Sequence, residues 1–228
     1  SKNYGDNWIS AGYALWYLRE SRYLSHARSI LGTSCAVSGT GFLFSRRIKN
    51  KMGGWPYHLL TEDIEFSVAQ IIDGEKIGFA PKAELYDEQP VNFKQSWNQR
   101  LRWSKGYYQV FGKYGKGLIK GMFKGNFSCF DMSMTIMPAA VLSIIAIFCN
   151  SVLGTLILIG NGATRECFHL LLNMLWGVYG TAFIIGAITT VTEWKKINLG
   201  VFRKIFYMFT FPLFMLTYIP ITIVAIFK

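Results

Sequence analysis

The stretch MSMTIMPAAVLSIIAIFCNSVLGTLILIG, residues 132–160, contains no Asp, Glu, Lys or Arg. Residues 168–191 and 205–227 are likewise free of them. A helix rises about 1.5 Å per residue, so about 20 apolar residues cross a hydrocarbon core about 30 Å thick. Each run is longer than that, which predicts about three transmembrane helices. Pro212 and Pro220 interrupt the third run, so we expect a bent or re-entrant segment there.

The net charge of +11 is confined to the second part of the chain. Residues 1–91 hold ten Lys and Arg against ten Asp and Glu, whereas residues 92–228 hold fourteen against three. The excess therefore flanks the uncharged runs, where it suits anionic lipid headgroups and not nucleic acid. Residues 161–167, between two runs, contain one Arg beside one Glu. The positive-inside rule predicts a multi-pass protein of the cell membrane, with residues 1–131 cytoplasmic and residues 161–167 outside.

Residue patterns divide the chain into three parts. Residues 1–91 mix helical and strand patterns, which indicates an α/β domain. Residues 92–131 form a basic juxtamembrane segment with an amphipathic helix from about Phe93 to Phe111, and residues 132–228 form the transmembrane region. The elements predicted in the first part are helices near 8–24 and 63–73 and short strands at 42–44, 77–80 and 83–86.

An acidic pair, Glu62-Asp63, follows Thr61 at the start of the second predicted helix. Acidic side chains are favoured in a first helical turn, where each contributes about 0.3–1 kcal/mol against the helix dipole. A carboxylate in that place can also accept a proton from a sugar hydroxyl as a general base. Position alone leaves both interpretations open.

The helix predicted from Phe93 to Phe111 has two different faces. Gln99, Arg102 and Trp103 share one side, at i, i+3 and i+4 spacing. The opposite side is an apolar stripe of Phe93, Trp97, Leu101, Ser104 and Tyr108. An interfacial anchor would explain the stripe and the basic residues, but not the Gln and Trp on the polar side. An arginine can grip a diphosphate through its donor fork, and an indole face can stack on a sugar ring.

Together these residues resemble the motifs of a known family. Thr61-Glu62-Asp63 and Gln99-Arg100-Leu101-Arg102-Trp103 are similar to the Thr-Glu-Asp and Gln-x-x-Arg-Trp motifs of membrane-integrated family 2 glycosyltransferases. That family includes the synthases of cellulose, hyaluronan, chitin oligomers and poly-N-acetylglucosamine. Gly39-Thr40-Gly41 resembles the acceptor-side loop that precedes the motifs, although a tight connection between strands would explain the glycines as well.

The resemblance implies roles for these residues in an α/β domain of the GT-A type. Asp63 would be the catalytic base, and Glu62 would shape the site. Gln99, Arg102 and Trp103 would hold the nucleotide diphosphate and the acceptor sugar. The remaining residues of the implied nucleotide and acceptor site are Thr61, Gly39, Thr40 and Gly41.

The resemblance also implies an incomplete site. The family's metal-binding Asp-x-Asp has no match in residues 1–60, where Asp6 is the only Asp. The chain would therefore be the C-terminal half of an enzyme, inactive alone, with the ligands of Mg²⁺ or Mn²⁺ upstream. No metal ligand is expected within it, because its cysteines and histidines lack metal-ligand spacing.

The implied reaction is inverting transfer of a sugar from a UDP-sugar to a growing β-linked polysaccharide at the cytoplasmic face of the membrane. The partners would be the UDP-sugar, a glycan or lipid acceptor and membrane lipids, with no nucleic acid. Two alternatives stay open. One is an enzyme of the same fold that adds a single sugar to a lipid acceptor, and the other is a non-catalytic component of membrane transport or assembly.

Overall fold

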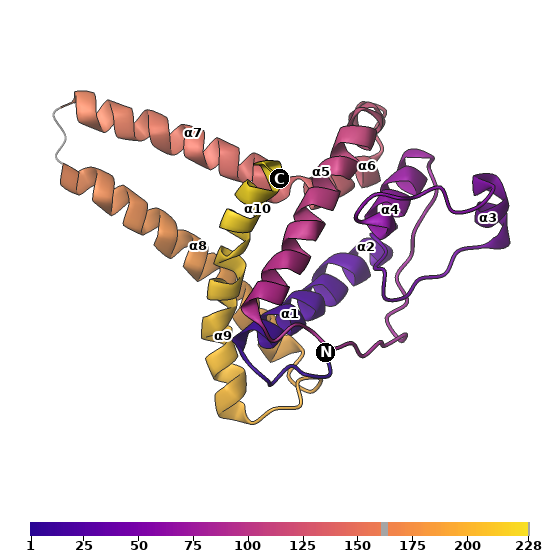
Figure 1. The fold of residues 1–228 in the computed structure, drawn as a ribbon, viewed down its shortest axis with the longest axis horizontal. Coiled ribbons are helices and arrows are strands. Elements are labelled where there is room, and N and C mark those ends of the chain that lie inside the picture. Colours follow the sequence, from indigo (N-terminus) through magenta and orange to yellow (C-terminus); the bar gives the residue numbers. More distant parts are fainter. Residues whose placement is uncertain (161–163, 228) are drawn as a thin grey trace.

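A computed structural model describes residues 1–160 and 164–227 of the chain, and the elements in this part are helices. Figure 1 shows α7 and α8 projecting together from the rest, with α9 and α10 forming one column. The N-terminal helix consists of α1 (Trp8–Arg19), the π-helix η1 (Glu20–Ser25) and α2 (His26–Ile30). The other helices are α3 (Arg46–Met52), α4 (Glu62–Ile72), α5 (Phe93–Phe123), α6 (Phe127–Ile136), α7 (Pro138–Ile159), α8 (Thr164–Thr192), α9 (Val201–Leu216) and α10 (Tyr218–Phe227).

The N-terminal helix extends beyond the predicted residues 8–24 and packs against two different neighbours. Before the π-helix, Leu15 of α1 is buried against Phe211 of α9. After it, the guanidinium of Arg28 binds both carboxylate oxygens of Asp131 on α6, at 2.6 and 3.0 Å. Such a two-point ion pair fixes orientation as well as distance. The helix therefore ties α9 to α6.

No strand forms in residues 1–160 or 164–227, so the expected α/β layering is not confirmed. The backbone amide of Cys35 donates to the Ile77 carbonyl at 2.9 Å, but the neighbouring amides find side chains instead. The amide of Val37 donates to the Ser67 hydroxyl, and that of Ile77 to the Ser34 hydroxyl. A ladder needs successive backbone bonds between neighbouring strands. The structure therefore contradicts the three predicted strands, at 42–44, 77–80 and 83–86.

The helix predicted at residues 63–73 is confirmed as α4, whereas α5 continues past Phe111 to Phe123. Glycine costs about 1 kcal/mol relative to alanine inside a helix, and several lie in this extension. Their missing side chains allow close packing. A Cβ on Gly117 would lie 2.9 Å from Ile72 of α4, and one on Gly121 would overlap Cys129 of α6. Contact with α4 and α6 therefore sustains the longer helix.

The core of the N-terminal part lies where α4, α5 and α6 meet. Because α5 also packs against α10, the helices that carry the sequence motifs rest directly on the C-terminal helices. The buried side chains of the core are Ile64, Val68, Ile71, Val110, Leu118, Cys129, Met132 and Ile136.

Two helical stretches are long and apolar enough to cross a membrane, Leu172–Thr192 and Val201–Phe227. They correspond to the second and third uncharged runs. The third run is interrupted at Thr217, which separates α9 from α10, and the bent or re-entrant form expected there stays a prediction. Pro212 lies inside α9.

The first uncharged run does not form one helix. It divides at Met137: Met132 and Ile136 belong to α6 and are buried in the core, and the rest of the run forms α7. The loop predicted at residues 161–167 includes residues 161–163, which lie outside the described residues.

Candidate active site

The N-terminal end of α4 packs closely against α5. Thr61, the residue before α4, is 4% exposed. A Cβ on Gly106 of α5 would lie only 2.5 Å from the Thr61 side chain, so glycine is what permits this approach. The amide of Leu60 donates to Gln109 on α5 at 3.3 Å. The acidic pair is therefore held against α5 one helical turn beyond Trp103.

Glu65, in the first turn of α4, fixes the loop that leads to the acidic pair. Its buried carboxylate accepts hydrogen bonds from the amides of His58 and Leu59, both at 3.0 Å, from Lys113 at 2.6 Å and from the Tyr114 hydroxyl at 3.1 Å. Burial raises the pKa of Glu65, but the bonds from Lys113, Leu59 and Tyr114 outweigh it and hold the pKa below its usual 4.5. Glu65 thus serves as an ionised anchor.

Replacing Glu65 by alanine is expected to lower the free energy of unfolding by about 2–4 kcal/mol, because two backbone amides and a phenol lose their acceptor. Glu65→Gln keeps an acceptor oxygen, so its free energy of unfolding should fall by less. Since the folded state lowers the pKa of Glu65, its contribution is present above about pH 4.5 and disappears as the pH falls through the folded value. Thermal unfolding of the detergent-solubilised full-length protein at several pH values measures both effects.

The control is Glu84→Gln, which removes an exposed carboxylate 3.9 Å from Lys196. This variant should unfold like the unaltered protein, because exposed ion pairs contribute little. If Glu65→Ala and Glu84→Gln lowered the free energy of unfolding equally, the anchoring role of Glu65 would be contradicted.

Asp63 is half-buried and directed toward the glycine turn. Its carboxylate accepts hydrogen bonds from the amide of Gly39 at 2.9 Å and from that of Ile64 at 2.8 Å. Burial raises the pKa of Asp63 above its usual 3.8, the two amides counter part of the rise, and the charge of Glu62 adds to it. Glu62 itself is exposed. A carboxylate with a raised pKa is a better proton acceptor than an ordinary aspartate.

The Gly39-Thr40-Gly41 segment is a turn whose first amide binds Asp63. The Gly41 amide donates to the Ser38 carbonyl at 3.1 Å, and the Ser38 and Thr40 hydroxyls lie 3.1 Å apart. No strand flanks the turn in the described part of the chain, so the strand-connection interpretation loses its support. The predicted acceptor loop and the predicted base are therefore neighbours.

The Gln99, Arg102 and Trp103 side chains differ in exposure. Arg102 is exposed, whereas Gln99 and Trp103 are partly buried. The Trp103 ring meets Tyr13 of α1 edge-on, with centroids 6.0 Å apart. The predicted polar side of α5 is therefore open to solvent at Arg102, whereas Tyr13 of the N-terminal helix covers part of Trp103. The predicted apolar stripe contacts two helices, because Phe93 stacks on Trp8 of α1 and the Tyr108 hydroxyl donates to the Thr222 carbonyl of α10 at 3.3 Å.

Six buried side-chain polar atoms lack a hydrogen-bond partner among the described residues, and they include the Thr61 hydroxyl at the junction of α4 and α5 and the Gln99 side-chain oxygen on α5. Buried polar atoms are rarely left unsatisfied, and an unpaired one calls for a ligand or water. Both atoms belong to the residues that the sequence motifs select. The junction is therefore suited to a polar ligand.

Comparison with known protein families shows to which family the chain belongs. The sequence model of glycosyl transferase family group 2 matches residues 3–227, almost the whole chain. The chain belongs to that family. Matches to individual relatives are partial. The probable glycosyltransferase YdaM of Bacillus subtilis is 36% identical over 78 residues, which are 34% of this chain and 19% of the relative.

Two relatives of this family 2 glycosyltransferase have names that specify a product. A catalytic chain of the UDP-forming cellulose synthase of Dictyostelium discoideum is 26% identical over 105 residues, 46% of this chain and 10% of the relative. The poly-beta-1,6-N-acetyl-D-glucosamine synthase of Staphylococcus aureus is 28% identical over 87 residues, 38% of this chain and 21% of the relative. The chain thus spans about a fifth or less of the length of these relatives. No solved structure matches it.

The sequence analysis did not identify two tyrosines on which the charge of Asp63 acts, Tyr17 of α1 and Tyr107 of α5. Burial raises the pKa of both phenols, and the charges of Asp63 and Glu20 raise both further. Both phenols are therefore neutral at pH 7 and can donate hydrogen bonds. Tyr107 could have been noticed as the residue one turn beyond Trp103, but nothing in the sequence brings the N-terminal helix to this glycosyltransferase site.

The carboxylates at the junction do not form a site for Mg²⁺ or Mn²⁺ by themselves. The described residues bring together no cluster of three or more His, Cys, Asp or Glu side chains. Asp63 already accepts two amide hydrogen bonds, and Glu62 is its exposed neighbour. Divalent cations of this kind need several oxygen ligands. The expected metal therefore has no ligand set here.

Proposed function

We propose that this glycosyltransferase moves a sugar from a UDP-sugar to a growing β-linked polysaccharide, with inversion at the anomeric carbon. The observation that carries the proposal is the junction of α4 and α5. There Asp63 lies against the Gly39 turn, and Thr61 is pressed onto Gly106, next to Trp103. The polymer-forming names of two relatives support a polysaccharide product.

In this proposal three residues of the chain have separate roles. The Asp63 carboxylate takes the proton of the acceptor hydroxyl while that oxygen attacks the anomeric carbon, and the bond to UDP breaks on the opposite side. The exposed Arg102 is free to bind the diphosphate through its donor fork. Trp103, held edge-on by Tyr13, offers an indole surface to the acceptor sugar.

The membrane arrangement forms part of the proposal. The stretches Leu172–Thr192 and Val201–Phe227 would cross the cell membrane together with α7, leaving residues 1–131 cytoplasmic. The segment between α8 and α9 and the first turn of α9 together hold four basic side chains, of which Lys204 of α9 lies 4.3 Å from the Trp194 ring centroid and donates to the Trp194 carbonyl at 2.8 Å. A tryptophan and a lysine are typical of a helix end at the membrane interface.

Labelling of intact cells with a membrane-impermeant maleimide tests this topology. We expect Cys167 to react and a cysteine introduced by Lys196→Cys to stay unlabelled, because basic loops remain inside. Cys35 and Cys129 are buried and give little background. Cys167→Ser is the control that must abolish the signal. Labelling at position 196 with none at Cys167 would reverse the orientation.

Product length tests the reaction itself. Full-length enzyme in membranes, incubated with radiolabelled UDP-sugars, should yield a ladder or smear of high-molecular-mass glycan on a gel. A single labelled band that extracts with lipid would contradict polymer synthesis and would indicate transfer of one sugar to a lipid acceptor. If no UDP-sugar is consumed, the enzymatic proposal itself is wrong.

A further inference from the structure

Arg100, between Gln99 and Arg102 on α5, is a fully buried cation. Its side chain is 0% exposed and is the largest fully buried side chain of the described residues. The ion pairs found there include no carboxylate partner for it. A buried charge without a counter-ion is costly unless other groups compensate for the lost water. Arg100 therefore needs a structural explanation.

Aromatic rings, the end of α9 and the Ser96 carbonyl, to which Nε donates at 3.3 Å, compensate for part of that cost, whereas the Nη2 atom has no hydrogen-bond partner among the described residues. The guanidinium carbon lies 4.5 Å from the ring centroid of Phe214, 4.8 Å from that of Tyr218 and 5.9 Å from that of Tyr13. Rings within about 6 Å attract a cation through their electron-rich faces. The Nη1 atom donates to the Thr217 hydroxyl at 2.6 Å and to the Phe214 carbonyl at 3.3 Å.

The contact point is the break between α9 and α10. Phe214 lies in the last turn of α9, and Thr217 follows its final residue. Free carbonyls and the helix dipole make a helix C-terminus partly negative, which favours a cation there. On the other side, Tyr13 touches both Phe214, with centroids 5.0 Å apart, and Trp103. One arginine thus joins the end of α9 to the helical turn that carries Trp103.

We propose that Arg100 is a positioning residue that clamps the Gln99–Trp103 turn of α5 to the α9–α10 break. The clamp makes the geometry of the acceptor side depend on the break between α9 and α10. The proposal rests on the proposed function for what the turn does, but not for the clamp itself. Arg100 acts through Tyr13 and Trp103, because it has no exposed surface with which to touch a substrate.

Thr217 provides a test that leaves the arginine in place. Thr217→Val removes the hydroxyl that Arg100 binds, and Thr217→Ser retains it. With full-length enzyme in nanodiscs, Thr217→Val should lower kcat about tenfold, as expected for losing one hydrogen bond to a charged group. The KM for the UDP-sugar should change by less than about twofold, since Arg102 does not touch the clamp in this assignment. Thr217→Ser should restore kcat.

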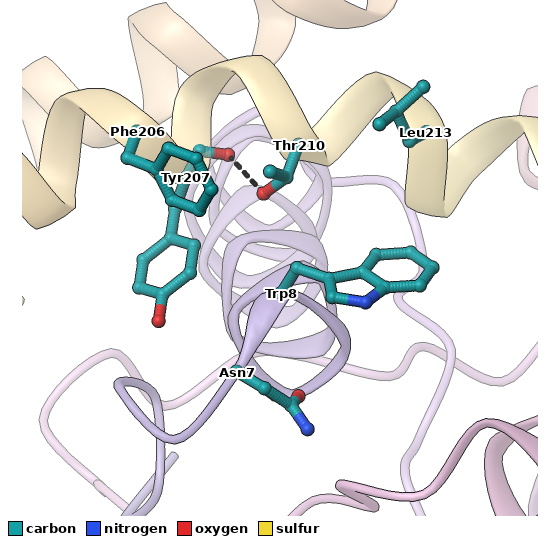
Figure 2. A pocket seen from close by; sticks show the side chains of 6 residues that line it. All are labelled: Asn7, Trp8, Phe206, Tyr207, Thr210 and Leu213. Carbon is teal, nitrogen blue, oxygen red and sulfur yellow. Dashed lines mark hydrogen bonds between the residues drawn. The ribbon is translucent and has the colours of Figure 1, made fainter.

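The matched control is Thr210→Val in the same helix. The Thr210 hydroxyl donates to the Tyr207 carbonyl three residues earlier, as the Thr217 hydroxyl does to Phe214. Figure 2 shows this bond at a pocket of about 390 Å³ between α1 and α9, which none of the predicted site residues lines. Thr210→Val should leave kcat unchanged. A loss of activity equal to that of Thr217→Val would overturn the clamp.

Arg100→Lys supplies a second, independent measurement. Lysine keeps the charge but cannot bond the helix end and stack on the rings as a planar guanidinium does. We expect a lower kcat with an unchanged KM for the donor, together with a fall in thermal stability like that of Thr217→Val, because both variants lose the bond to the helix end. If Arg100→Lys and Thr217→Val both keep full kcat while Asp63→Asn is inactive, the clamp is wrong and the proposed function stands. If Asp63→Asn is active, the proposed base is wrong, and the clamp is then judged by the thermal stability of the Thr217 variants, which should fall for valine and recover for serine.

Discussion

Asp63→Asn in the full-length enzyme is expected to abolish sugar transfer while UDP affinity stays within about twofold of the unaltered enzyme. Loss of a positioned general base typically costs about 10²–10⁴-fold in rate. We expect nucleotide binding to be unaffected because the Asp63 carboxylate faces the amide of Gly39, on the turn proposed to bind the acceptor. Single-turnover transfer and calorimetric titration with UDP measure the two quantities. Activity within a few-fold of the original would remove Asp63 from the role of base.

Stability and pH provide controls for that experiment. Asp63→Asn replaces one of the two carboxylate oxygens that accept the Gly39 and Ile64 amides by an NH2 group, so thermal unfolding of this variant is measured beside its activity. Loss of activity without loss of stability separates catalysis from folding. The transfer rate should fall as the pH drops through the raised pKa of Asp63, because only the ionised base accepts a proton. Glu62→Gln, at the exposed neighbour, should retain most activity.

Arg102→Ala and Trp103→Phe are expected to impair different steps. Arg102→Ala should weaken UDP binding by about 1.5–3 kcal/mol, since it removes a charge-assisted contact to the diphosphate. Trp103→Phe should leave UDP affinity intact and shorten the product, because the smaller ring offers less surface to the acceptor sugar. Phenylalanine is preferred to alanine here, since Trp103 also packs against Tyr13.

Lys105→Ala is the control on the same helix. It removes a nearby positive charge from α5 without altering either assigned contact. In UDP titration and product-length analysis, Lys105→Ala should show the same UDP affinity and the same product length as the unaltered enzyme. If the three α5 variants lose UDP binding equally, the helix is only an interfacial anchor, and the assignment of Gln99, Arg102 and Trp103 fails.

The sequence predicted the helices of the site better than their surroundings. Apolar spacing identified α4 and the start of α5, because a helix that packs on a core repeats its buried positions. The predicted strands failed, because the amides of Val37 and Ile77 bond to serine side chains. Such bonds link residues that are far apart in sequence and leave no local pattern.

Burial of charged side chains could not be predicted either. Glu65 and Arg100 would ordinarily be assigned to the surface, since charged residues are rarely buried unless paired. Glu65 is paired with Lys113 and Tyr114 of α5, and Arg100 is held by the Phe214 carbonyl, the Thr217 hydroxyl and aromatic rings of other helices. The cover that Tyr13 gives to Trp103 comes from the N-terminal helix for the same reason. Only the tertiary arrangement reveals these contacts.

The π-helix at Glu20–Ser25 makes the length of the N-terminal helix as important as its composition. An α-helix turns the chain by about 100° per residue, and a π turn accommodates one extra residue. Because Leu15 faces α9 and Arg28 faces Asp131 of α6, both directions are in use at once. Deleting any one residue between them would rotate Arg28 away from its carboxylate by about 100°. A substitution in this segment therefore alters the contacts of one side chain. A single-residue deletion or insertion instead changes the direction of every later side chain of the helix.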